Sequence, residues 1–368
     1  MSAISFKTLT SDDVTTSRTL LHESIPITGT LLSGTYNQAA SSSVRAYQQN
    51  IKSFSHGMFQ SVYDYPFASS SANHIFDITA GFSSVADGKS LSSSANVHVS
   101  KKVNIYNQMA MQLVGYDTSG NIRKFDFDGD HSTDAGKAHN LYFINFSRLL
   151  VKDEIKKGSF ELQIGNQSQH TADVRMDTVT TISDAAATTT YRSNSPAGEY
   201  GFLKSGDTTV GLIYYQAGIV CLTGSVLASM QLAPGGTKLN DVAKTAAQVT
   251  HLTVMQSGTI DQVADSLRNR IKNISFNNTT ELNSTIYFCR AHKGEFNYSS
   301  NPTYLSGSKI RVKTIPGSGN EFANPPISYV TTVGLYSPDN ELLAVAKLSE
   351  PVKKTPINEL NFRVRLDY

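Results

Sequence analysis

The clearest pattern of apolar and polar positions lies near the C-terminus. Residues 329–336 are rich in β-branched and aromatic side chains, and residues 342–348 form a second apolar run. The segment Ser337-Pro338-Asp339-Asn340 between them is typical of a turn, because proline presets φ and Asp and Asn bond to their own backbone. The pattern therefore predicts a β-hairpin over residues 329–348.

This hairpin carries no nucleophile, no metal-ligand cluster and no phosphate-binding loop. Strands with such a sequence act by pairing and packing, so we expect the hairpin to contact other chains. The residues expected at this interface are the apolar and aromatic ones, namely Tyr329, Val330, Val333, Leu335, Tyr336, Leu342, Leu343 and Val345.

Other apolar runs predict further strands, and one apolar run, at 141–151, fits a strand or a short helix. The strands are expected at residues 75–82, 159–164, 210–215, 218–222, 284–289 and 362–366. Apolar positions at a spacing of three and four predict helices over 101–115 and 260–271. Two weaker helical patterns lie at 44–51 and 241–249.

These elements predict a mixed, β-rich α+β fold with antiparallel, sandwich-like sheets, a few short helices and long polar loops. The organisation that we expect has three parts. Residues 1–35 form an extended N-terminal arm, residues 36–275 form a central β-rich region, and residues 276–368 form a C-terminal β domain.

Composition narrows the class of partner. The net charge is +2, from 32 basic and 30 acidic residues, so the sequence lacks the basic excess that nucleic-acid binders usually show. Charged residues make up 17% of the chain, below the roughly 25% of average soluble domains. Ser, Thr, Asn and Gly take their place, as in many β-rich extracellular or virion proteins.

The sequence predicts neither a disulfide framework nor a membrane anchor. Cys221 and Cys289 lie in apolar surroundings and are expected to be buried free thiols, although a single disulfide is the alternative. The N-terminus lacks the basic leader and apolar core of a secretory signal, and no apolar run is long enough for a transmembrane helix.

One acidic loop has the composition of a metal site. Residues 125–134 read FDFDGDHSTD, with carboxylates at Asp126, Asp128, Asp130 and Asp134. Hard cations such as Ca²⁺ take several oxygen ligands, which makes this loop a calcium candidate. The pattern departs from the EF-hand, because the glycine comes too early and no glutamate stands at position twelve. A solvated acidic turn is the alternative interpretation.

No catalytic motif is present. The nine histidines form neither an HExxH pattern nor an HxH pair, and GxSxG, GxGxxG and GxxxxGK[ST] are missing. The sequence therefore indicates a protein that is not an enzyme, with no catalytic residues to name and no cofactor beyond the calcium candidate.

Several stretches resemble virion structural proteins of contractile-tailed bacteriophages of the marine cyanobacterial type. They are TSRTLLHESIPITGTLLSGTY (16–36), SHGMFQSVYDYPF (55–67), SANHIFDITAGF (71–82), VNIYNQMAMQLVGYD (103–117), INFSRLLVKDEIKKGSFELQIG (144–165), NSPAGEYGFL (194–203) and YFCRAHKGEFNYSSNPTY (287–304). The hairpin resembles a VTEIGLYD…G.LLAV pattern of tail-fibre and baseplate-attached proteins. It departs from that pattern at Thr332, where an acidic residue is usual, and in its glycine-free turn.

The resemblance implies a structural subunit of a tailed-phage virion, located in the tail, at the baseplate or its periphery, and acting by protein–protein assembly. The expected partners are other tail or baseplate proteins, in a homo- or hetero-oligomer, without nucleic acid or membrane. A neck, collar or capsid-associated protein and a receptor- or glycan-binding tail module are the alternatives.

Overall fold

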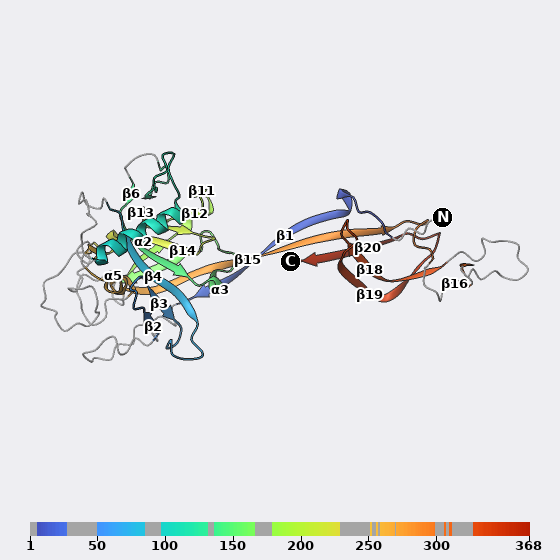
Figure 1. Ribbon diagram of the computed structural model, residues 1–368, viewed down its shortest axis with the longest axis horizontal. Coiled ribbons are helices and arrows are strands. Elements are labelled where there is room, and N and C mark those ends of the chain that lie inside the picture. Colours follow the sequence, from blue (N-terminus) through green and yellow to red (C-terminus); the bar gives the residue numbers. More distant parts are fainter. Residues whose placement is uncertain are drawn as a thin grey trace, which may run out of the picture. The chain divides into compact units, whose positions relative to one another are not determined.

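A computed structural model describes residues 6–27, 50–84, 97–131, 136–165, 179–228, 251, 255–256, 258–268, 270–298, 305–306, 309–310 and 327–368. The chain divides into two compact units. Unit 1 comprises Met1–Leu20 and Glu281–Tyr368, and unit 2 comprises Leu21–Thr280. Both divisions fall inside long strands, β1 (Val14–Pro26) and β15 (Ile271–Ala291), which Figure 1 shows in blue and orange. Residues 1–20 thus group with the C-terminal part of the chain.

Unit 2 is built on a sheet with the strand order β15–β9–β10–β12–β13–β14–β7–β4–β3–β2. The defined registers along this order are antiparallel, and β11 and β8 are added at β12 and β15. The strands are β2 (Ile51–Ser53), β3 (Gln60–Tyr63), β4 (His74–Phe82), β7 (Asn140–Phe146), β8 (Glu154–Ile155), β9 (Glu161–Gly165), β10 (Val179–Ser183), β11 (Tyr191–Ser195), β12 (Gly198–Ser205), β13 (Thr208–Tyr214) and β14 (Ile219–Thr223). A separate pair joins β5 (Phe125–Asp126) to β6 (Lys137–Ala138).

Both faces of this sheet are buried, which explains the continuous apolar runs of its central strands. Successive side chains of a strand point to opposite faces. In β7, Tyr142 and Ile144 belong to one core cluster, whereas Leu141 and Phe143 belong to the other. The strands predicted at 75–82, 159–164, 210–215 and 218–222 are confirmed, and the run at 141–151 contains both β7 and the short helix α3 (Arg148–Val151).

The predicted helix at 101–115 is confirmed as α2 (Val97–Leu113), which lies over the sheet in Figure 1. Of its apolar positions at a spacing of three and four, Tyr106, Ala110 and Leu113 are buried, and Val103 and Met109 are partly buried. The helix packs closely against β4 at Gly81, where a Cβ would lie 2.8 Å from the backbone nitrogen of Tyr106. Only glycine permits this backbone-to-backbone approach.

The predicted helix at 260–271 is confirmed as α5 (Ile260–Arg268) but is shorter than expected. Ile271 does not extend its apolar face, because Ile271 already belongs to β15 and pairs with Ile164 of β9. Of the two weaker helical patterns, 241–249 lies outside the described residues. In the pattern at 44–51, residues 44–49 also lie outside the described residues. The prediction of a helix is wrong at Ile51, because Ile51 begins strand β2.

Unit 1 contains parts of β1 and β15, the strand β20 (Leu360–Asp367) and the predicted hairpin. The hairpin is confirmed: β18 (Ser328–Tyr336) pairs antiparallel with β19 (Leu342–Lys354). Its turn is closed by a bond from the Asn340 backbone N–H to the Ser337 carbonyl, 3.0 Å long. Asn340 has φ 63°, so asparagine holds the left-handed position where glycine is more usual. The other short elements are the 3₁₀ segments Ser11–Asp13, Ala185–Thr188 and Gly224–Leu227 and the pair β16 (Leu305–Ser306) and β17 (Lys309–Ile310).

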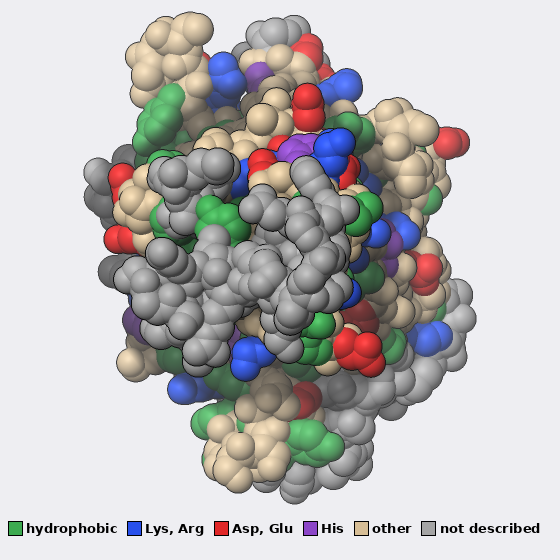
Figure 2. Space-filling model, turned by 90° about the vertical axis from the view of Figure 1, so that its right-hand side faces the viewer, with side chains coloured by type: hydrophobic (Ala, Val, Ile, Leu, Met, Phe, Trp, Pro, Cys, Tyr) green, Lys and Arg blue, Asp and Glu red, His purple; other side chains and the backbone are tan. Residues whose placement is uncertain are grey.

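The structure confirms the predicted fold class, since antiparallel strands dominate and the helices are few, with α2, α3 and α5 as the named α-helices of the described residues. No helix in this part of the chain is long and apolar enough to cross a membrane. On the side shown in Figure 2, acidic and basic side chains are intermixed and hydrophobic side chains reach the surface at several places.

Candidate functional site

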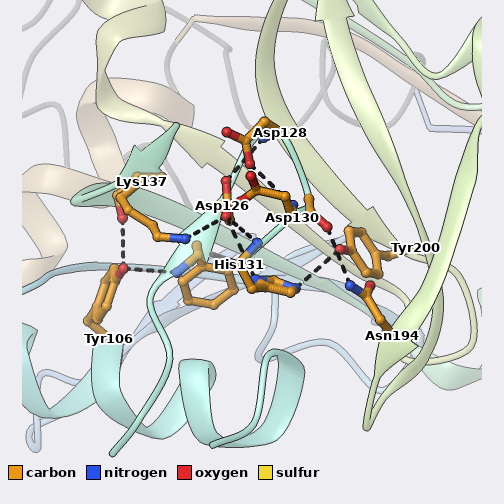
Figure 3. A network of polar contacts seen from close by, with 11 residues as sticks. Tyr106, Asp126, Asp128, Asp130, His131, Lys137, Asn194 and Tyr200 are labelled. Atoms are coloured by element: carbon orange, nitrogen blue, oxygen red, sulfur yellow. Dashed lines mark hydrogen bonds and ion pairs between the residues drawn. The ribbon is translucent and has the colours of Figure 1, made fainter. Parts of the chain in front are cut away.

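The acidic loop follows the short strand β5 of unit 2, which pairs with β6, and Figure 3 shows the side chains of Asp126, Asp128, Asp130, His131 and Lys137. Asp126 and Lys137 are direct partners in this two-stranded ladder, so their side chains leave the same face. The Lys137 ammonium lies 2.5 Å from Asp126 Oδ2, and the Asp126 side chain is fully buried. The local fold therefore places a carboxylate and its counter-ion at the base of the loop.

The loop backbone folds around Asp126. Its Oδ2 accepts a hydrogen bond from the His131 backbone N–H at 2.9 Å, and its Oδ1 accepts one from Asp128 N–H at 3.1 Å. Burial by itself raises the pKa of Asp126, but hydrogen bonds from Asp128, Lys137 and His131 outweigh it and hold the pKa at about 2. The contact of its side chain with that of Asp126 raises the pKa of Asp128.

The structure brings three of the four predicted metal ligands together. Each of Asp126, Asp128 and Asp130 has a carboxylate oxygen within 4.8 Å of the others. Asp126 is buried, whereas Asp128 and Asp130 are exposed. Asp134, the fourth predicted ligand, lies outside the described residues.

Sequence reasoning did not include His131 in this site. The His131 side chain is only 10% exposed, and its Nδ1 is 3.9 Å from Asp126 Oδ2. Its other ring nitrogen lies 3.5 Å from the Tyr200 hydroxyl on β12. Asn194 of β11 also reaches the loop and donates to the Gly129 carbonyl at 3.3 Å. The loop is thus supported from outside by the strands of the unit 2 sheet (Figure 3).

The predicted interface residues of the hairpin occupy different environments. Leu335 is only 9% exposed, and Val330 and Val333 are half-buried. The other five are exposed, at 62% for Tyr329, 47% for Tyr336, 53% for Leu342, 67% for Leu343 and 53% for Val345. The structure therefore separates a covered set from an exposed set.

We call the exposed residues Tyr336, Leu342, Leu343 and Val345, together with Phe6, the hairpin patch. Val345 lies opposite Gly334, and a Cβ on Gly334 would lie 3.0 Å from the Tyr336 ring and 3.4 Å from Leu342. The side chains of Tyr336 and Leu342 thus both lie beside the backbone of Gly334, which has no side chain of its own. The Phe6 ring meets Tyr336 edge-on, with 5.1 Å between centroids, and is 54% exposed.

Unit 1 has few buried apolar side chains. Among its described residues, only Ala291, Leu335 and Val364 are buried and apolar, and every member of the two large core clusters belongs to unit 2. Unit 1 also buries a polar group: the fully buried Lys354 donates from its ammonium to Asn297 Oδ1 at 2.8 Å and to the Lys293 carbonyl at 3.2 Å.

A shallow hollow in unit 2 provides no acid–base pair. It lies beside α2 and is lined by His56, Met58, Phe59, Thr79, Ile105, Gln108, Met109 and Gln112. This lining contains no carboxylate and no nucleophilic thiol. The two cysteines are both free, with Cys221 buried as expected and Cys289 only partly buried.

No protein-family model matches the chain, and no curated protein and no solved structure matches it either.

Proposed function

We propose that the chain is a structural subunit of a tailed-phage virion, in the baseplate or its periphery, and that it acts by assembly through unit 1. The phage setting rests on the sequence resemblance described above. The role of unit 1 rests on one structural observation: its apolar side chains are on the outside, in the hairpin patch, rather than in a core of its own.

Magnitudes support this role. Full burial of an apolar side chain contributes about 1.5–3 kcal/mol, whereas fixing one residue of backbone costs about 1–2 kcal/mol. With three buried apolar residues, unit 1 gains little from apolar burial of its own for strands as long as β18, β19 and β20. Burial of the hairpin patch against another chain adds to this contribution.

The strand β1 also carries exposed apolar side chains. Every residue from Thr15 to Ser24 is exposed, including Leu20 at 46% and Leu21 at 50%. One edge of β1 pairs with β15, and in unit 1 Arg18 forms an ion pair with Glu281 of β15. A strand that is uncovered on both faces is suited to packing or pairing with a neighbouring subunit.

Purified virions of the phage that encodes the chain test this proposal. We expect mass spectrometry to find the chain at constant stoichiometry in particles and in isolated tails, and antibodies against unit 1 to bind less to intact tails than to the free chain. A chain found only in the soluble fraction of infected cells would refute the proposal.

A further inference from the structure

The acidic loop of unit 2 is not used by the assembly role proposed above, and its chemistry is that of a cation site. Three carboxylates lie with oxygens within 4.8 Å of one another, and the Lys137 ammonium contacts one of them, that of Asp126. Carboxylates this close repel one another, and a cation bound between them relieves that repulsion.

A second observation points into the same space. His131 Nδ1 is buried and has no hydrogen-bond partner among the described residues. Its ring is nine-tenths buried and faces Asp126 Oδ2 at 3.9 Å, which is too long for a hydrogen bond. A buried imidazole nitrogen without a partner is costly, so a bound species is expected to satisfy it.

We propose that Asp126, Asp128 and Asp130 bind one Ca²⁺ ion and that His131 Nδ1 accepts a hydrogen bond from a water of that ion. Oxygen ligands outnumber nitrogen ones, which favours a hard cation. Ca²⁺ takes six to eight ligands, and the open side at Asp128 and Asp130 admits the waters that complete such a shell. The ion fixes the loop against Tyr200 of β12 through His131.

Lys137 is expected to limit the affinity of this site. The Lys137 ammonium contacts Asp126 Oδ2, which also accepts a hydrogen bond from the His131 backbone N–H. The bound ion and Lys137 therefore compete for the same carboxylate. Replacing Lys137 by methionine removes the competing charge and keeps most of the apolar stem. The K137M variant is therefore predicted to bind Ca²⁺ at least about tenfold more tightly than the wild type.

Differential scanning calorimetry of the full chain, after EDTA treatment and dialysis, tests the proposal. With 1 mM CaCl₂ the melting midpoint of the wild type is expected to rise by at least about 2 °C, because the ion binds only the folded state. D130N is expected to lose the shift. D207N, at an exposed turn between β12 and β13, is the matched control and is expected to retain it.

Isothermal titration gives the deciding outcomes. Ca²⁺ binding that is lost in D130N and strengthened in K137M supports the proposal. Equal melting midpoints in EDTA and CaCl₂, with no heat of binding at millimolar Ca²⁺, overturn it. Binding of Zn²⁺ but not of Ca²⁺, abolished by H131A, overturns the calcium assignment because it makes the imidazole a direct ligand.

Discussion

The Tyr215 hydroxyl donates a hydrogen bond to Asp184 Oδ2 across 3.0 Å in the interior of unit 2. The same carboxylate accepts the backbone N–H groups of Gly158 at 2.8 Å and Phe160 at 2.9 Å. Asp184 is fully buried, and burial raises its pKa against the effect of these bonds. One side chain therefore joins the turn before β9, the end of β10 and the end of β13.

Replacement of Asp184 by alanine is predicted to destabilise unit 2 by about 3–5 kcal/mol, because three buried or partly buried donors lose their acceptor. Tyr215→Phe removes one of the bonds and is predicted to cost about 1 kcal/mol. Urea denaturation followed by far-ultraviolet circular dichroism measures both changes. Equal effects of the two substitutions would show that the backbone bonds to Asp184 contribute nothing.

The backbone of β12 leaves room for the same tyrosine. A Cβ on Gly201 would lie 2.1 Å from the Tyr215 hydroxyl oxygen and 3.1 Å from Ala187. Gly201→Ala is therefore predicted to lower the free energy of unfolding by about 1–3 kcal/mol through overpacking.

Tyr215→Phe is expected to recover part of the Gly201→Ala loss, since it removes the nearest atom. A double-mutant cycle measures this coupling. Gly294→Ala is the control, because a Cβ there meets nothing within 4 Å. Strict additivity of the Gly201 and Tyr215 substitutions would contradict the close contact.

Lys102 of α2 predicts a pH dependence. Its side chain is fully buried, its ammonium donates to the carbonyls of Met255 and Gln256, and burial lowers its pKa from 10.5 to about 8. Between pH 8 and pH 10.5, Lys102 is protonated in the unfolded chain and deprotonated in the folded chain. Because the unfolded state then binds more protons, stability from this group rises with pH between 8 and 10.5 and is level below 8.

The comparison with Lys102→Met isolates this effect. From pH 8 to pH 10, the free energy of unfolding of the wild type is expected to gain on the order of 2 kcal/mol relative to that of the variant. Urea titrations at half-unit pH steps measure the difference. Parallel pH profiles of the two proteins would place the pKa of Lys102 in its ordinary range.

Much of the fold of unit 2 could be predicted because its central strands are buried on both faces. Leu141 to Ile144 read as an uninterrupted apolar run for that reason. The strands β1 and β15 were harder to predict over their full lengths, because β1 is exposed and β15 contains the polar run from Asn277 to Glu281. These two strands are stabilised by pairing with segments that are distant in the sequence, which the pattern of apolar residues does not show.

The acidic site could be predicted only in part. Alternate spacing indicated Asp126, Asp128 and Asp130, but Lys137 enters through cross-strand pairing eleven positions away. His131 enters through a left-handed backbone, with φ 58°, that turns its ring toward Asp126. The spacing of residues in the sequence shows neither the pairing of Lys137 with Asp126 nor the orientation of the His131 ring. In the hairpin, the shift in register after Leu335 likewise decides which apolar residues are exposed.

The hairpin patch is predicted to be neutral for the stability of the free chain. Leu343 and Val345 are 67% and 53% exposed, so their replacement by lysine removes little buried surface. The double variant Leu343→Lys/Val345→Lys is expected to melt within about 2 °C of the wild type in calorimetry. A large loss of stability would show that the patch already belongs to the core of unit 1.

Incorporation into particles tests the assembly role most directly. A phage lacking its own copy of the gene is supplied in trans with the wild type, with Leu343→Lys/Val345→Lys, or with Leu149→Lys, which changes an 85% exposed leucine of α3 in unit 2. Quantitative mass spectrometry of purified tails is expected to find the wild type and Leu149→Lys at equal copy number, and the hairpin variant strongly depleted although folded. Equal incorporation of all three chains, or absence of the wild type from tails, would contradict the proposed role of unit 1.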